Sequence, residues 1–280
     1  MSSDEIRVWT PGEVADLELM HASVATTGLK KHVHDCLSVS VTESGSGRLS
    51  FSTVTHAVTR DDVAFFNPGE VHAERRAGQD KWVYRTFLVG RPLLLRAAEE
   101  VRWHREYPPR FPVGKVRDPS LAQLLRNLHR ILEQPSSRLE CESWVMWAVA
   151  GLVRGYGGGG DEAGCTHSGR QSLQAVRNYL HTHYGEDVSI KDLAKIANMS
   201  PTHLIRSFHG LYGMPPMAYQ QAVRIVQVKR ALRSGSSIVD AALEAGFYDQ
   251  SHLNRVFKRV TGITPGQYRV AARSGAEDFE

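Results

Sequence analysis

The feature that most constrains the fold is an internal repeat in the C-terminal part of the chain. The pattern His-Leu-x-Arg-x-Phe, followed at fixed spacing by Gly, Pro and Tyr, runs from His203 to Tyr219 and returns from His252 to Tyr268. The copies are 49 residues apart (252 minus 203), and a Ser-Ile-x-Asp-x-Ala pattern precedes both. A unit repeated at this period predicts one supersecondary structure built twice. We interpret each copy as a short helix, a turn and a second helix.

The predicted turns carry the residues that such turns require. Asn198 and Gly246 stand at the aligned positions between the two helices, and both residue types adopt positive φ at low cost. Ser200 before Pro201, and Asp249, supply caps for the helices that follow. Each second helix then has one apolar stripe and one polar face. It ends at a glycine, Gly213 or Gly262.

The polar face of each second helix is the candidate DNA-reading surface. Matched arginines occupy both faces, and arginine is the residue best suited to bind guanine through two hydrogen bonds. The alternative is that each face is an ordinary solvated helix surface. Because both copies carry a polar face with arginine at the same position, this alternative is less favoured. Ile205 fits either a thymine-methyl contact or a half-buried position. The candidate residues are Thr202, His203, Ile205, Arg206 and His209 in the first copy, and Gln250, Ser251, Asn254, Arg255 and Lys258 in the second.

The spacing and charge of this region agree with that interpretation. Residues 216–232 predict a connecting helix of about 25 Å, which can hold two reading helices about 34 Å, or one DNA turn, apart. Residues 170–280 contain 14 Lys and Arg against 9 Asp and Glu, whereas residues 1–169 contain 20 against 21. A basic half joined to a neutral half suits phosphate binding by the basic half.

The C-terminal signature resembles the DNA-binding domain of the AraC/XylS family of transcription regulators. It runs from Gly246 to Arg269 as Gly-Phe-x-Asp-Gln-Ser-x-Leu-x-Arg-x-Phe-Lys-Arg-x3-Gly-x-Thr-Pro-x2-Tyr-Arg. The resemblance implies that each second helix enters a major groove and that the chain forms a homodimer. His209 departs from the lysine usual in that family, so a phosphate contact by the first copy is in doubt or depends on pH.

The first 90 residues predict a small β-barrel or jelly roll, because short alternating runs are separated by turn residues. His32-Val-His34 and a motif ending at His72 resemble the two motifs of the cupin fold. Three imidazoles there could converge on a metal. Leu37 and Ser38, however, occupy the place of the carboxylate in the cupin metal set, so we expect a ligand pocket and no metal. The expected effector-binding residues are His21, His32, His34, His72, Trp82 and Tyr84, although the two aromatic side chains also fit a plain barrel core.

The chain divides into four expected segments within an α+β fold. They are a cupin-like effector-binding barrel at 1–92, a helical packing or dimerisation segment at 93–156, a glycine-rich linker at 157–169 and the two helix-turn-helix units at 170–280. The three cysteines, Cys36, Cys141 and Cys165, are few and odd in number, which favours a reducing cytoplasm. No apolar run is long enough to span a bilayer.

We therefore expect a sequence-specific transcription regulator, an activator, controlled by a small-molecule effector in the barrel. Its expected partners are double-stranded promoter DNA, the effector, RNA polymerase and a second copy of the chain, with no cofactor and no catalysis. Two alternatives remain open. One is a cupin metalloenzyme fused to a DNA-binding module, supported only by the three histidines, and the other is a ligand-independent DNA binder whose barrel serves for dimerisation.

Overall fold

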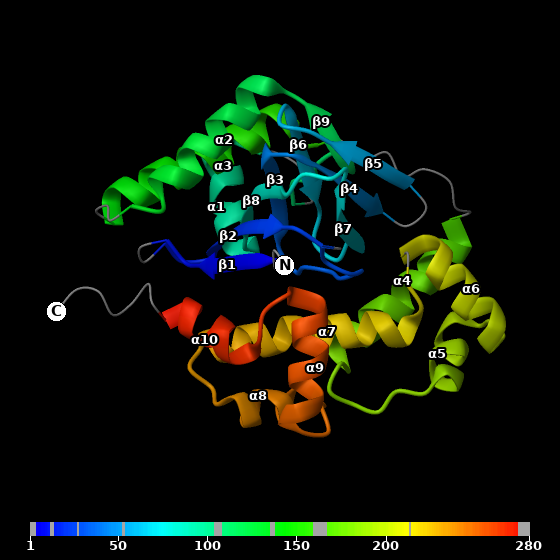
Figure 1. The fold of residues 1–280 in the computed structure, drawn as a ribbon. Coiled ribbons are helices and arrows are strands. Elements are labelled where there is room, and N and C mark those ends of the chain that lie inside the picture. The colour runs from blue at the N-terminus through cyan, green and yellow to red at the C-terminus, as the bar shows by residue number, and fades with distance from the viewer. Residues whose placement is uncertain are drawn as a thin grey trace.

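A computed structural model describes residues 4–11, 14–26, 28–51, 54–103, 108–134, 138–158, 167–212 and 214–273. Strands β1 to β8 come first, and the rest of the described chain is mainly helical, with β9 between α1 and α2 (Figure 1). The strands are β1 (Glu5–Trp9), β2 (Leu17–Val24), β3 (Leu37–Ser44), β4 (Ser46–Phe51), β5 (Val54–Val58), β6 (Asp62–Phe66), β7 (His72–Ala77), β8 (Trp82–Val89) and β9 (Gly114–Arg117). The helices are α1 (Arg91–Glu100), α2 (Pro119–Ile131), α3 (Arg138–Tyr156), α4 (His167–Thr182), α5 (Ile190–Ala197), α6 (Pro201–Tyr212), α7 (Pro216–Arg233), α8 (Ile238–Glu244), α9 (Gln250–Thr261) and α10 (Pro265–Arg273).

Two antiparallel sheets form the N-terminal domain. The larger has the strand order β1-β2-β8-β3-β6-β9, and the smaller has the order β5-β4-β7. Neighbouring residues on β8 separate onto opposite faces of the larger sheet, so Trp82 and Tyr84 enter one apolar core and Phe87 enters another. This arrangement confirms the expected cupin-like β-domain.

The helices α1, α2 and α3 cover one face of the larger sheet. Their apolar side chains, including Leu94, Leu125 and Val149, share a core with Val39 and Phe87 of the sheet. The sequence pattern left open whether these helices pack on the barrel or on a second subunit. Their buried stripes pack on the barrel.

The helical C-terminal part contains the two predicted helix-turn-helix units, α5 with α6 and α8 with α9. The long helix α7 joins them, as the pattern of residues 216–232 predicted. Figure 1 shows α7 running beneath the N-terminal sheets, with α5 and α6 at one end and α8 and α9 at the other. Each unit is therefore held at one end of a single rigid helix.

The two halves of the chain share apolar cores, which the sequence did not indicate. Met20 and Tyr84 of the larger sheet pack in one cluster with Ile225 of α7 and Tyr268 of α10. A further cluster joins Val33 of the N-terminal domain to the first helix-turn-helix unit. The helical C-terminal part is thus packed against the N-terminal domain.

Some expectations fall on residues that the structure does not describe. They concern Gly213, Cys165 and most of the glycine-rich stretch, since 159–166 lies outside the described ranges. The domain limits in that stretch therefore remain predictions. Among the described helices, none combines the length and the apolar character needed to span a bilayer.

Candidate DNA-binding face and effector cavity

The two turns are built from the residues that the repeat singled out. Asn198 ends α5 in the left-handed region with φ 51°, and Gly246 has φ 78° at the matching place after α8. In the helices that follow, the side chain of Ser200 accepts the backbone N–H of His203, and that of Asp249 accepts the backbone N–H of His252. These caps fix where α6 and α9 begin, and so fix which side chains share a face.

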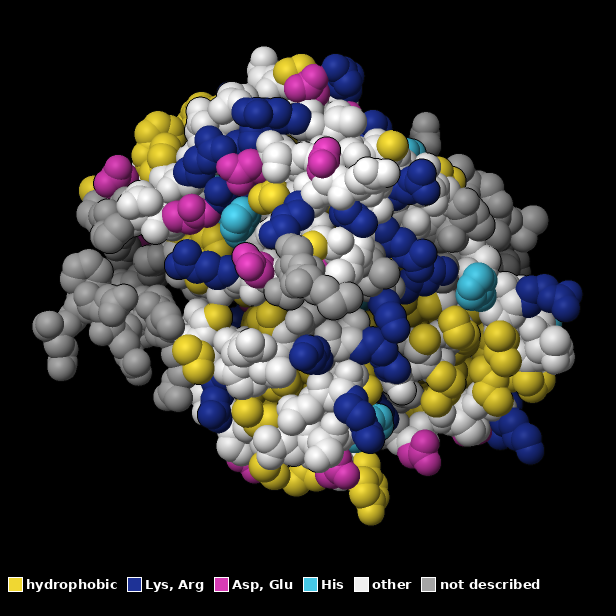
Figure 2. All heavy atoms as spheres, viewed as in Figure 1, with side chains coloured by type: hydrophobic (Ala, Val, Ile, Leu, Met, Phe, Trp, Pro, Cys, Tyr) yellow, Lys and Arg dark blue, Asp and Glu magenta, His cyan; other side chains and the backbone are white. Residues whose placement is uncertain are grey.

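Both second helices bury one stripe and expose the other, as their patterns predicted. Leu204 and Phe208 of α6, and Leu253 and Phe257 of α9, are fully buried. The candidate reading residues are exposed, except Asn254, which is half-buried, and Ile205 is 42% exposed. Figure 2 shows Lys and Arg side chains over this half of the molecule and along its boundary with the N-terminal half. The candidate faces of α6 and α9 are therefore exposed to solvent.

A cavity of about 590 Å³ lies where the N-terminal domain meets α7 and α10. Its walls come from both halves of the chain. Apolar side chains such as Met20 and Leu29 line it from the N-terminal domain, and Val226 lines it from α7. Its size and mixed lining are typical of a small-molecule site.

Charged groups from both halves meet at this cavity. The buried carboxylate of Glu18 lies 3.5 Å from Nζ of Lys229 and 3.5 Å from a guanidinium nitrogen of Arg233, and it accepts a hydrogen bond from the hydroxyl of Tyr268. Arg230 is ion-paired with Asp35. Burial and the neighbouring carboxylate raise the pKa of Tyr268 well above its ordinary value. Three cations therefore share two carboxylates at the junction of the domains.

Three histidines lie together beside the cavity. His32 and His72 exchange backbone hydrogen bonds of 2.9 and 3.0 Å, and the backbone N–H of Gly69 donates to the carbonyl of His34 at 2.7 Å. These bonds bring one ring nitrogen of each of the three histidines within 4.8 Å of the others. Burial lowers the pKa of His32 to about 4 and those of His34 and His72 well below the ordinary value. The three rings are therefore neutral near pH 7, which leaves nitrogen lone pairs that can hold a metal ion.

The six expected effector-binding residues do not line one cavity. His32 and His34 line it, and His72 lies behind them. Trp82 and Tyr84 are 1% and 0% exposed, and they stack on each other within the apolar core. The hydroxyl of Tyr84 donates to Glu74 at 2.7 Å, and burial raises the pKa of Glu74 to about 7. The expectation that these two aromatic side chains form a pocket wall is corrected, because both are buried within an apolar core, the alternative that their pattern also allowed.

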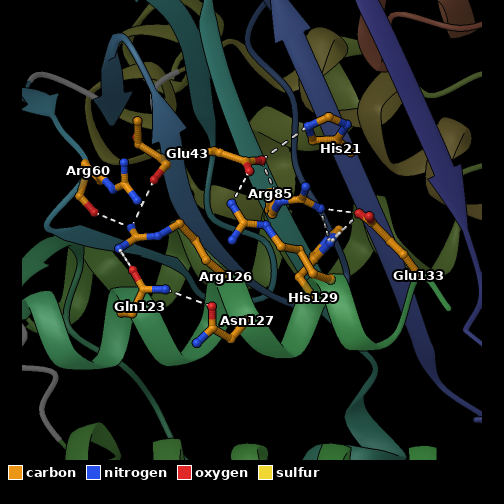
Figure 3. Close-up of polar contacts among 11 residues, drawn as sticks. His21, Glu43, Arg60, Arg85, Gln123, Arg126, Asn127, His129 and Glu133 are labelled. Carbon is orange, nitrogen blue, oxygen red and sulfur yellow. Dashed lines mark hydrogen bonds and ion pairs between the residues drawn. The ribbon is translucent and has the colours of Figure 1, made fainter.

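His21 lies on the other face of the larger sheet, away from the three histidines. Figure 3 shows it directed toward Glu43, in a polar network between α2 and the larger sheet. Nε2 of His21 lies 3.6 Å from a carboxylate oxygen of Glu43. Arg85 in that network contacts Glu43, His129 and Glu133. Burial alone would raise the pKa of Glu43, but hydrogen bonds from Arg130 and Arg85 lower it to about 2. The position of His21 as a pocket residue is therefore corrected, since the period-two alternation of β2 turns it away.

Sequence reasoning missed the charged residues of the cavity. Lys229 and Arg230 lie in the connecting helix predicted for residues 216–232, and Arg233 directly follows it, but their charges were counted only toward phosphate binding. A signal was present, since Lys229 and Arg233 are four residues apart and so share a helix face. Glu18 gave a second signal, because it is an acid in a strand whose residues are otherwise mostly apolar.

Comparisons with known proteins agree with this two-part organisation. Residues 14–149 match the AraC-like ligand binding domain family, and residues 193–271 match a helix-turn-helix domain family. The chain is 28% identical over 224 residues to the uncharacterized HTH-type transcriptional regulator YbfI of Bacillus subtilis, covering 79% of this chain and 80% of the relative. It is 23% identical to the HTH-type transcriptional activator RhaS of an Enterobacter species, covering 85% and 87%.

The fold is also similar to a solved structure over almost its whole length. That structure is unsaturated fatty acid bound wild-type ToxT from Vibrio cholerae, with a TM-score of 0.55 and 12% identity, covering 97% of this chain and 96% of the other. At this identity the likeness shows a shared fold.

Proposed function

Because the chain belongs to the AraC family of transcription regulators, with an N-terminal ligand-binding domain and a C-terminal helix-turn-helix domain, we propose that an effector in the interdomain cavity controls how α6 and α9 meet promoter DNA. The observation that carries this proposal is the composition of the cavity, whose lining comes from both halves of the chain. A ligand shifts a conformational equilibrium only through different affinities for the two arrangements. A ligand in this cavity contacts both halves, so its affinity would depend on how the two halves are arranged.

The effector class we propose is an apolar molecule with one anionic group. The lining holds four cationic side chains against three carboxylates, and the rest of it is largely apolar. The cations are Arg91, Lys229, Arg230 and Arg233, and the carboxylates are Asp16, Glu18 and Asp35. An entering carboxylate would compete with Glu18 and Asp35 for their cations, and would thereby loosen or rearrange the contacts between the domains. The fatty acid bound to ToxT, which shares this fold, has the same chemistry.

Thermal unfolding with oleate, compared with oleyl alcohol as the uncharged control, tests this effector class. A ligand of the folded state stabilises it by about 2.7 kcal/mol at 100 times its Kd. We expect oleate to raise Tm more than the alcohol does, and Lys229→Met to reduce that difference. Equal shifts for acid and alcohol, or the same response in Lys229→Met as in the wild type, would count against an anionic effector.

We further propose that the regulator is a homodimer that activates transcription and contacts RNA polymerase. The relative RhaS is an activator, which supports this direction of regulation. Support for the dimer comes from α3. Its Leu139, Trp144 and Trp147 are 75%, 41% and 57% exposed, although other side chains of the helix are buried against the sheet domain. Exposed aromatic side chains on one helix are typical of an interface.

A further inference from the structure

We propose that His32, His34 and His72 bind one divalent transition metal ion, such as Zn²⁺, at the wall of the interdomain cavity. The three donor nitrogens come from two segments about 40 residues apart in the chain, held together by the backbone bonds between His32 and His72 and between Gly69 and His34. These backbone bonds hold together the segments that carry the three rings, whether or not a ligand is bound. The centroids of the His32 and His72 rings are 4.2 Å apart.

The tautomers of two of these histidines are set for coordination. Nδ1 of His32 donates to the carbonyl of Lys30 at 2.7 Å, and Nδ1 of His72 donates to the carbonyl of Glu70 at 3.0 Å. With the proton held on Nδ1, each Nε2 presents a lone pair. A second ring nitrogen that donates to a backbone carbonyl is the usual support of a histidine that binds a metal.

One of these lone pairs is orphaned. Nε2 of His72 is buried and has no hydrogen-bond partner within the described part of the chain, and the residue is 1% exposed. A buried polar atom left without a partner is costly and calls for an explanation. An ion bound between the three rings would give Nε2 of His72 the partner that it lacks.

The donor set selects the class of metal. Imidazole nitrogens suit Zn²⁺, Cu²⁺, Ni²⁺ and Fe²⁺, whereas Mg²⁺ and Ca²⁺ require oxygen ligands. No carboxylate or thiol of the described residues joins the three-histidine group. Three protein ligands leave a fourth position for water or a small molecule. Since His32 and His34 line the cavity, that position is reached from the cavity.

This inference does not depend on the proposed effector, because metal uptake and oleate binding are measured separately. The test uses the full-length chain without a histidine tag, stripped with EDTA and then dialysed against Zn²⁺ or Co²⁺. We expect about one ion per chain by elemental analysis. Bound Co²⁺ should show d–d absorption without the charge-transfer band of a thiolate ligand, and Zn²⁺ should displace it.

Variants assign the ion to the three histidines. His34→Gln and His72→Gln should weaken metal affinity by more than about tenfold, whereas the matched control His21→Gln, on the other face of the sheet, should bind as the wild type does. If His72→Gln does not fold by circular dichroism, the half-buried His34 carries the test. Uptake well below one ion per chain, a thiolate band in the cobalt spectrum, or unchanged affinity in His34→Gln would overturn the proposal.

Discussion

Glu18 on β2 lies 3.5 Å from Nζ of Lys229 on α7, across 211 residues of sequence. The same carboxylate contacts Arg233 and accepts a hydrogen bond from Tyr268 of α10. The helix that carries both helix-turn-helix units is therefore tied to the sheet that carries the ligand-binding domain. A ligand that altered this contact would act on the helix that joins both DNA-binding units, as the proposed function requires.

Glu18→Gln should lower the free energy of unfolding by about 1 to 3 kcal/mol, because it removes the charge that Lys229, Arg233 and Tyr268 share. It should also change the affinity for operator DNA in the absence of effector, since the domain contact is loosened. Urea unfolding and fluorescence anisotropy measure the two effects. The control is Glu5→Gln, an exposed acid on β1. Equal unfolding curves for the two variants would show that the contact does not stabilise the fold.

Gly246→Ala should destabilise the second helix-turn-helix unit by about 1 to 3 kcal/mol. Gly246 has φ 78°, and an added Cβ would lie 2.3 Å from the carbonyl oxygen of Gly185. The control is Gly151→Ala within α3, where a Cβ meets nothing within 4 Å. Removing a helical glycine there should raise stability by about 0.5 to 1 kcal/mol. Thermal unfolding measures the stability of both variants. An unchanged Tm in Gly246→Ala would contradict the turn geometry.

Trp147→Glu should convert a dimer into a monomer, because it places a charge in the exposed aromatic face of α3. Trp147 packs edge to face with Trp144, with ring centroids 5.9 Å apart. Light scattering during size-exclusion chromatography gives the mass in solution. Val54→Glu, on an apolar residue of β5 that is 53% exposed, is the control. A wild-type protein that remains monomeric at micromolar concentration refutes this interface.

Stability should fall as pH drops from about 6.5 to about 4, in part because of His129. Burial, with Arg85 beside it, lowers the pKa of His129 to about 4 in the folded protein, whereas an unfolded histidine titrates near 6.5. Between these values only the unfolded chain binds the proton, so acid favours unfolding by up to about 3 kcal/mol for this group. Above about pH 6.5 its contribution is complete.

His129→Gln removes that titration, so the difference in unfolding free energy between pH 7.5 and pH 4.5 should shrink by part of that amount. The remaining slope comes from His21, His32, His34, His72 and His181, whose pKa values are also lowered. Glu70 and Glu74 oppose it, because burial raises the pKa of both carboxyls in the folded protein. Urea unfolding at a series of pH values gives both slopes. Parallel slopes for wild type and variant would place the proton uptake elsewhere.

The local structure of the DNA-binding part was readable from the sequence because its determinants are local. Asn198 and Gly246 adopt the positive φ that their residue types suggested, and Asp249 caps α9 as expected. The buried stripes of both second helices follow directly from their spacing. The two-sheet domain was predicted for the same reason, since alternation and turn residues are local signals.

The cavity was not predictable, because its residues meet only through packing. Glu18 and Lys229 are joined by folding alone, and no local signal pairs two groups 211 positions apart. The glycine-rich stretch suggested separate halves, yet Ile225 and Tyr84 share one core. The hydrophobicity of a side chain predicts that it is buried, but the tertiary fold decides which other side chains it contacts.

Hydroxyl-radical footprinting on an operator tests most directly whether one chain presents α6 and α9 to the same side of DNA. We expect two protected segments of the DNA backbone about 10 base pairs apart. Arg206→Ala should erase one and Arg255→Ala the other, each at a cost of about 1 to 3 kcal/mol in discrimination against random DNA. Lys258→Ala should weaken binding to all sequences alike and lower the salt slope by about one. A single protected segment, or arginine variants that lose equal affinity for operator and random DNA, would contradict the account.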